Sequence, residues 1–376
     1  MKILQIAPAW IDTPPKDYGG TELVIDSLVK GLVNIGHEVT LFATKKSKTP
    51  ANLEYVFEKS FLDKNIPWIA ALPSFIHYNE AFSRAQDFDI VHAHLSSDTD
   101  PMIMGFLANL TVPSVMTIHS RLPLDKFSHM DKYFMKLYAN KISAISISKT
   151  MLKELPRGFR NMGFVHNSLD LSKFKFNPNK GEFLTWLGKI LPAKGLYEAI
   201  MASKKAGEQL IFGGVVDNFR EDSINYFEQK IKPLIDGNQI KYLGPADLRL
   251  KNYLFSNAKA FLNPINWVEP FGMVMAESMA CGTPVISFDR GAASELIVDK
   301  KTGFLVKTFD QMVETISRID EINRADCRQH MENNFSPETA AEKTTKILFH
   351  EINRFWRERR KLTVIRRKDY ETGYSI

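Results

Sequence analysis

The sequence predicts an α/β protein built from two doubly wound parallel sheets that face each other across a cleft. Its 376 residues exceed what one hydrophobic core usually serves, so two domains are expected. Short apolar runs alternate with segments of helical periodicity, which is typical of parallel sheets with helices on both faces. A polar stretch at 177–182, NPNKGE, separates two series of such runs, and we expect a linker there.

The first series opens with a β-α-β unit. Apolar runs at 2–10 and 39–44 flank a helical pattern that ends at Gly36 and is formed by Val24, Leu28, Leu32 and Ile35. Further strands of this series are expected at 90–95, 114–119, 142–148 and 163–166.

The second series follows the linker. Its strands are expected at 183–188, 209–214, 240–244, 260–264, 284–288 and 303–306. We therefore expect a first Rossmann-like domain at 1–175, a second at 176–345, and a helix with a basic tail at 346–376 that packs back on the first domain. Ligands of such sheets bind beyond the carboxyl ends of the strands, so chemistry is expected in the loops there.

The composition is that of a soluble globular protein, with 44% apolar and 24% charged residues. No apolar run has the length of about 20 residues that a membrane helix needs, and the first residues do not form a signal peptide, so a cytoplasmic location is expected. Two cysteines, Cys281 and Cys327, are too few for a disulfide framework or a zinc site.

The net charge of +6 is concentrated near the C-terminus, where 354–368 holds eight basic residues and one acid. With Phe355 and Trp356, this stretch could contact the inner face of a membrane peripherally, or it could be a solvated helix end. Nucleic-acid binding is not expected, because no zinc-finger spacing or aromatic RNA-binding motif occurs elsewhere.

A glycine loop follows the first strand. Gly19 and Gly20 allow a tight turn with exposed N–H groups, and Thr21 is placed to cap the helix behind it, so the loop could hold a phosphate. It matches neither the GxGxxG nor the Walker A pattern, which disfavours NAD and ATP, and we expect no cofactor. The alternative is a turn that serves only to enter the helix.

Two lysines flank the loop after the first strand of the second series. Lys189 and Lys194 could neutralise a diphosphate, whose developing charge as a leaving group needs fixed cations or a metal; the alternative is ordinary surface charge. The Asp-x-Asp sequence from Asp98 to Asp100, in a loop after a predicted strand, is too short a match to predict a metal site.

A single carboxylate, Glu277, lies within an otherwise uncharged helix predicted from Phe271 to Gly282, with Pro270 near its first turn. A buried carboxylate needs hydrogen-bond donors, which a ribose diol supplies; an internal ion pair or a loop cap is the alternative. The free N–H groups of Phe271, Gly272, Met273 and Val274 could bind an anion.

Histidines mark the ends of strands in the first series. His119 closes one strand and is a candidate site residue, although a structural role is common for such a histidine. His92 and His94 share one face of the preceding strand. No acidic or cysteine partner has matching spacing, so a metal is not expected.

Together these motifs resemble the family 4 glycosyltransferases, retaining enzymes of the GT-B fold. The matching segments are YGGTE at 18–22, GHEVTLF at 36–42, TIHS at 117–120, VHNSLD at 165–170, LGKILPAKG at 187–195, EPFGMVMAE at 269–277, ACGTPVI at 280–286, GAASE at 291–295 and TGFLV at 302–306. The likeness is weakest at 46–88, 121–140 and 320–376.

The resemblance implies a UDP- or GDP-sugar donor, held mainly by the second domain, and an acceptor that the sequence does not identify. Glu277 would bind the ribose, and Lys189 and Lys194 the diphosphate. Glu269 would bind the transferred sugar, a hexose, and His119 would lie at the reacting centre. Main-chain groups of Phe271, Gly272 and Met273 would also contact the sugar, with Val274 nearer the phosphate and the Gly19–Gly20 loop closing over it.

The family works without a metal and retains the anomeric configuration, and a donor phosphate oxygen is thought to take the acceptor proton. Two positions depart from its pattern: Lys189 replaces an arginine, and Ser168 replaces a glycine after Asn167. Two alternatives stay open, namely a nucleotide-sugar epimerase or hydrolase of the same fold, and a nucleotide-sugar-binding protein without catalysis.

Overall fold

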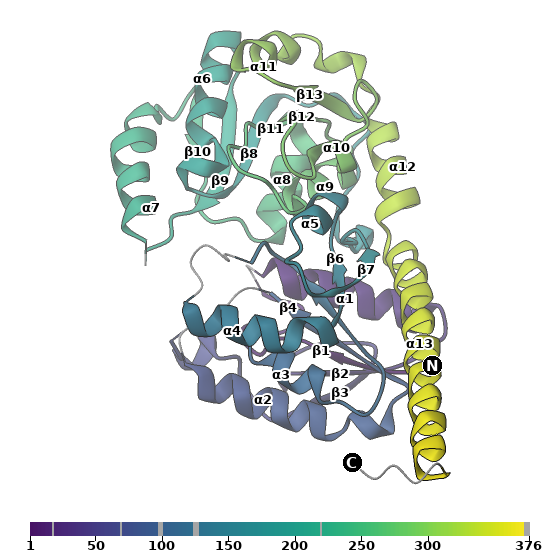
Figure 1. Ribbon diagram of the computed structural model, residues 1–376. Coiled ribbons are helices and arrows are strands. Elements are labelled where there is room, and N and C mark those ends of the chain that lie inside the picture. Colours follow the sequence, from purple (N-terminus) through teal and green to yellow (C-terminus); the bar gives the residue numbers. More distant parts are fainter. Residues whose placement is uncertain (17–18, 68–69, 97–100, 123–127, 219, 372–376) are drawn as a thin grey trace.

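The computed structural model describes residues 1–16, 19–67, 70–96, 101–122, 128–218 and 220–371, with side chains as far as residue 361. The chain forms two parallel sheets, as the sequence predicts (Figure 1). The first has seven strands in the order β3-β2-β1-β4-β5-β6-β7, and the second has six in the order β10-β9-β8-β11-β12-β13.

The strands of the first sheet overlap the first series of predicted apolar runs, with one addition, and the last strand begins at Arg160 rather than at residue 163. They are β1 (Lys2–Ile6), β2 (Glu38–Ala43), β3 (Asn52–Tyr55), β4 (Ile90–Leu95), β5 (Ser114–Ile118), β6 (Ser143–Ser146) and β7 (Arg160–Phe164). The sequence did not predict β3, a half-exposed edge strand of four residues, because so short a polar segment carries no apolar run.

Helices cover both faces of the first sheet. One apolar cluster joins it to α2 (Ala71–Ser83), α3 (Ile103–Ala108) and α4 (His129–Tyr138), while a second joins it to α1 (Gly20–Asn34) and α13 (Pro337–Glu371). A short helix, α5 (Lys149–Lys153), follows β6.

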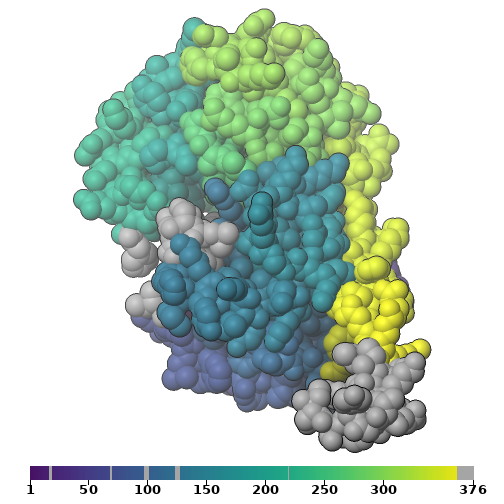
Figure 2. All heavy atoms as spheres, viewed as in Figure 1, coloured from purple at the N-terminus to yellow at the C-terminus, as the bar shows by residue number. Residues whose placement is uncertain are grey.

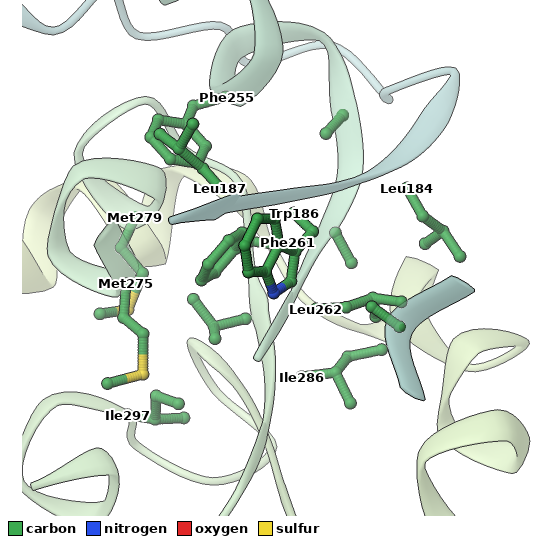
Figure 3. Close-up of a cluster of buried hydrophobic side chains, with 14 of the residues drawn as sticks. Leu184, Trp186, Leu187, Phe255, Phe261, Leu262, Met275, Met279, Ile286 and Ile297 are labelled. Carbon is green, nitrogen blue, oxygen red and sulfur yellow. The ribbon is translucent and has the colours of Figure 1, made fainter. Parts of the chain in front are cut away.

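The second sheet has one large core. Its strands are β8 (Phe183–Lys189), β9 (Leu210–Val215), β10 (Ile240–Tyr242), β11 (Ala258–Asn263), β12 (Val285–Phe288) and β13 (Gly303–Val306). Its helices are α6 (Leu196–Ala206), α7 (Glu221–Tyr226), α8 (Leu248–Asn257), α9 (Met273–Ala280), α10 (Ala293–Leu296), α11 (Phe309–Ile316) and α12 (Arg324–Phe335). Figure 3 shows Met275 and Met279 of α9 in the buried cluster around Trp186 and Phe261.

The last helix, α13, runs from the second sheet back to the first (Figures 1 and 2). It packs so closely on α1 that a Cβ on Gly31 would lie 2.1 Å from the main-chain oxygen of Pro337. The predicted boundary at 345 therefore falls inside one continuous helix, whereas the boundary near 175 falls between the two sheets. Among the described residues, no helix is both long and apolar enough to cross a bilayer.

Candidate active site

A cavity of about 720 Å³ opens between the carboxyl ends of the two sheets, where ligands of doubly wound sheets bind. Loops that follow strands of both sheets form its walls. Of the eleven predicted site residues, nine line it: Gly20, His119, Lys189, Lys194, Glu269, Phe271, Gly272, Met273 and Val274. Gly19 and Glu277 are not among the described residues that line it.

The glycine loop leads directly into α1. The helix begins at Gly20 with Gly19 as its N-cap, so the prediction that Thr21 caps it is wrong. A Cβ on Gly19 would lie 2.7 Å from Oε2 of Glu22 and 2.9 Å from Cβ of Pro15, so the loop has room only for glycine. Gly20 and Thr21 line the cavity with first-turn N–H groups, where the helix dipole favours an anion.

The two predicted lysines lie at one wall of the cavity. Lys189 ends β8, and Lys194 ends a 3₁₀ turn, Pro192–Lys194. Gly195 behind it has a φ of 73°, and a Cβ there would lie 2.0 Å from the main-chain oxygen of Pro264. This close approach needs glycine, and it holds the turn against the loop that follows β11.

Lys194 and Glu269 form an ion pair in the cavity wall. Nζ of Lys194 lies 2.8 Å from Oε2 of Glu269, which also accepts a hydrogen bond from the Trp267 indole at 3.0 Å. The Lys194 ammonium lies 4.5 Å from the centre of the Trp267 ring. Lys189 lies 3.8 Å from Oδ2 of Asp217. Each predicted diphosphate cation thus already has a carboxylate beside it.

The main chain of Glu269 is held by the GAASE segment. The Ala292 N–H donates to the Glu269 carbonyl at 2.9 Å, and a Cβ on Gly291 would lie 2.3 Å from the Glu269 nitrogen. Gly291 has a φ of 60°. The position of the Glu269 carboxylate therefore depends on a loop more than twenty residues further along the chain.

Helix α9 starts later than predicted. It begins at Met273 rather than Phe271, so Pro270 lies outside it. Gly272 is its N-cap with a φ of 94°, and a Cβ there would lie 2.2 Å from Cε of Met275. Because Met275 N–H already donates to the Gly272 carbonyl, the N–H groups of Met273 and Val274 are those available to a ligand.

Glu277 is 1% exposed and lies in the second turn of α9. Its Oε1 accepts from Nζ of Lys251 at 2.7 Å, so the internal ion pair that the sequence left as an alternative is present. Its Oε2 is buried and has no hydrogen-bond partner among the described residues. One carboxylate oxygen is thus used structurally, and the other keeps its capacity to accept.

His119 directly follows β5 and is also buried. Its Nε2 lies 2.9 Å from Nδ1 of His94, and its own Nδ1 has no partner among the described residues. Burial lowers the pKa of His119 to about 3, so the ring is neutral at physiological pH.

A contact between the two halves of the chain was not predicted. Oε1 of Glu295 accepts from Thr150 N–H at 2.8 Å, and Oε2 accepts from Lys149 N–H at 2.7 Å and lies 2.8 Å from Nε2 of His166. Burial opposes ionisation of Glu295, but these hydrogen bonds outweigh it and lower its pKa to about 2. Ser148 donates to the Pro270 carbonyl at 2.7 Å and adds a second link beside the cavity.

Two further cavity residues, Trp267 and Arg220, were not predicted from the sequence. Trp267 lies in the loop before Glu269, and Arg220 follows β9, where it pairs with Asp222 at 3.0 and 2.5 Å. An aromatic residue beside a predicted sugar-binding acid could have drawn attention to Trp267, whereas Arg220 belongs to no motif.

The remaining predictions concern Ser168 and metals. Ser168 is buried, does not have a positive φ, and lies with its Oγ 2.7 Å from Oγ of Ser27, so this turn does not use the freedom of a glycine. In the part of the chain that the structure describes, no group of three or more histidine, cysteine, aspartate or glutamate side chains could hold a metal. Asp98 and Asp100 lie outside that part, as does Tyr18 of the glycine loop.

Two opposed parallel sheets with a cavity between their carboxyl ends are the arrangement of the GT-B fold. Two family models match the chain, "Glycosyltransferase Family 4" at 18–173 and "Glycosyl transferases group 1" at 169–337. The chain belongs to glycosyltransferase family 4.

Relatives with similar sequences are also named as glycosyltransferases. An uncharacterized glycosyltransferase of Methanocaldococcus jannaschii is 23% identical over 305 residues, which are 77% of this chain and 80% of the relative. A phosphatidyl-myo-inositol mannosyltransferase of Mycolicibacterium smegmatis is 24% identical over 348 residues, 82% of each chain.

Solved structures share the fold. Sucrose-phosphate synthase from Thermosynechococcus elongatus superposes with a TM-score of 0.71 at 18% identity, over 93% of this chain and 98% of that one. HepE of Anabaena in complex with UDP and glucose gives a TM-score of 0.69 at 18% identity, over 93% of this chain and 100% of that one.

Proposed function

We propose that this glycosyltransferase moves a hexose from a UDP- or GDP-sugar to an acceptor, without a metal and with retention of the anomeric configuration. The observation that carries the proposal is the meeting of Lys189, Lys194 and the first turns of α1 and α9 at one cavity. Two cations and two helix N-termini can stabilise a departing diphosphate. HepE of Anabaena has been solved with UDP and with UDP-glucose, which supports a nucleotide-sugar donor.

In the proposed mechanism, the bond between the anomeric carbon and the diphosphate oxygen breaks as negative charge grows on the diphosphate. Lys189 and Lys194 and the N–H groups of Met273 and Val274 stabilise that charge. The acceptor oxygen attacks from the face that the diphosphate leaves, and its proton passes to a donor phosphate oxygen. Glu269 and His119 bind the transferred sugar, and Oε2 of Glu277 accepts from a ribose hydroxyl.

Release of nucleoside diphosphate tests this proposal. The protein is incubated with a panel of UDP- and GDP-sugars and candidate acceptors in the presence of a chelator, and we expect acceptor-dependent release that Lys194→Ala and Glu277→Ala each abolish. Turnover that survives unchanged in both variants would refute the site. Consumption of donor without acceptor would instead indicate a hydrolase or epimerase.

We further propose that the basic C-terminus is a peripheral contact with anionic membrane. Part of the basic charge at 354–368 is neutralised within the helix, because Arg354 pairs with Glu351 at 2.5 Å and with Glu358 at 2.5 Å. The remaining cations lie towards the end of α13. Deletion of 362–376 should weaken sedimentation with anionic liposomes at low salt, and unchanged sedimentation would exclude this role.

A further inference from the structure

Gln5, in the middle of β1, joins three buried histidines into one chain of hydrogen bonds. Oγ1 of Thr117 lies 2.7 Å from Nε2 of His92, and Nδ1 of His92 lies 3.1 Å from Nε2 of Gln5. Oε1 of Gln5 lies 2.8 Å from Nε2 of His94, and Nδ1 of His94 lies 2.9 Å from Nε2 of His119. The chain therefore runs from the sheet interior to a residue that lines the cavity.

The amide of Gln5 gives this chain a direction. In the structure the amide nitrogen faces His92 and the amide oxygen faces His94. Because the nitrogen can only donate and the oxygen can only accept, this orientation places the proton of His94 on Nε2. A neutral His94 then offers the lone pair of Nδ1, and His119 must donate to it from Nε2. These proton positions follow from the orientation of the Gln5 amide, because a reversed amide would place each proton on the opposite ring nitrogen. His119 is thereby left with an unprotonated Nδ1.

The histidines stay neutral because they are buried. Burial lowers the pKa of His92 and of His119 to about 3, and it lowers that of His94 well below its ordinary value of 6.5. Proximity to His119 lowers the pKa of His92 further, and proximity to both rings lowers that of His94. At neutral pH each ring therefore has one donor and one acceptor, and the direction set by Gln5 is transmitted without ambiguity.

We propose that Gln5 and His94 are positioning residues that hold His119 as its Nε2–H tautomer, so that Nδ1 accepts a hydrogen bond from a hydroxyl of the sugar. The inference rests on the proposed function, because it requires the cavity to take a sugar. A buried acceptor without a partner is costly, and a ligand hydroxyl supplies the missing donor. An ionised carboxylate or phosphate oxygen has no proton to donate to Nδ1. The ligand group that contacts Nδ1 of His119 is therefore a hydroxyl and not an anion.

The tautomer can be read directly in the free protein. With ¹⁵N-labelled histidine, two-bond proton–nitrogen correlation spectra distinguish Nε2–H from Nδ1–H rings, and a His119→Gln spectrum identifies the His119 signals. We expect His119 as Nε2–H. His77 is an internal reference, because its Nε2 lies 2.8 Å from the Ala7 carbonyl, which can only accept. A proton on Nδ1 of His119 would overturn the inference.

Two variants test whether Gln5 determines the tautomer of His119. Gln5→Leu removes the amide and should convert His119 into a mixture of tautomers, while His77 stays Nε2–H and reports an intact core. Thr117→Val removes only the hydroxyl that contacts His92, at the end of the hydrogen-bond network opposite to His119, and should leave His119 as Nε2–H. If Gln5→Leu keeps the wild-type tautomer, or if Thr117→Val loses it, Gln5 does not set the direction.

Ligand titration tests the hydroxyl. UDP-glucose and GDP-mannose are the probes, UDP and GDP are the controls without sugar, and thermal stabilisation shows which of them bind. A bound sugar nucleotide should move the Nδ1 resonance of His119, and the matching diphosphate should not. A sugar nucleotide that binds but leaves this resonance unchanged overturns the hydroxyl assignment. The tautomer of His119 is measured without turnover. A protein that transfers no sugar would therefore refute the proposed function, but it would not change the tautomer assignment.

Discussion

Nζ of Lys194 lies 2.8 Å from Oε2 of Glu269, although the two residues are 75 positions apart. The sequence assigns them to different parts of a donor, Lys194 to the diphosphate and Glu269 to the sugar. Their contact joins these roles, because a diphosphate that binds Lys194 changes the charge that Glu269 experiences. The pair therefore lies at the junction between leaving group and transferred sugar in the proposed mechanism.

We expect Lys194→Met to lower kcat/KM by about a hundredfold, the effect typical of losing one group that stabilises transition-state charge. Glu269→Gln should cost a similar factor, and the double variant should lose less than the product of the two, because they act as a unit. Initial rates of diphosphate release measure this. Lys259→Met is the matched control, since Lys259 pairs with Glu208 at 2.8 Å outside the cavity.

Measurements of stability and of nucleotide binding can distinguish the structural role of the Glu277–Lys251 ion pair from the proposed contact of Glu277 with the ribose. Lys251→Met leaves a buried carboxylate without its cation and should lower the free energy of unfolding by about 3 kcal/mol. Glu277→Gln removes that charge and should destabilise less, yet weaken UDP or GDP binding about tenfold by losing a charged acceptor for the ribose. Calorimetric titration and urea unfolding measure the two effects. Equal nucleotide affinity in wild type and Glu277→Gln would show that Glu277 serves only the ion pair.

Glu295 should make stability fall in acid. Its pKa is lowered from an ordinary 4.5 to about 2, so the unfolded chain takes up this proton first. The stability that it contributes is present above about pH 4.5 and is lost as the pH falls from there towards 2. Urea midpoints at pH 6 and pH 3.5 should therefore differ more for the wild type than for Glu295→Gln. An equal acid dependence in both proteins would contradict the assignment.

Glu22 should make stability fall as the pH rises, which is opposite to the effect of Glu295. Burial raises its pKa from 4.5 to about 7, partly offset by a hydrogen bond from its own N–H. The folded protein therefore holds this proton at a pH where the unfolded chain has lost it, and stability falls as the pH rises from about 4.5 through 7. The shift corresponds to about 3 kcal/mol. Relative to the wild type, Glu22→Gln should gain stability between pH 5 and pH 8.5 in urea unfolding, and no relative gain would refute the raised pKa.

The sheets could be predicted because strands buried on both faces are continuous apolar runs. In β4 and β12 every residue is buried, and every residue except His92, His94 and Ser287 is apolar. The edge strand β3 lies against one neighbour only and is half-exposed, so it has no such run. The start of α9 was misplaced because Pro270 suggested a first turn, whereas the left-handed conformation of Gly272 delays the helix until Met273.

The residues of the site were predicted better than their contacts. Lys194 and Glu269 were both identified, but their ion pair depends on the close approach of Gly195 to Pro264, which no local pattern encodes. The same is true of Lys251, which lies 26 residues before Glu277 on another helix. Periodicity predicts the face on which a side chain lies, but the partner across a tertiary contact depends on how two elements pack.

The anomeric configuration of the product tests the account most directly. Once a donor has been found, the product formed from an α-linked nucleotide sugar is followed by proton NMR from the earliest time points, with a chelator present. The account predicts an α-linked product, formed by the wild type and formed about a hundredfold more slowly by Lys194→Met. A β-linked product would contradict the proposal that the acceptor attacks from the face the diphosphate leaves.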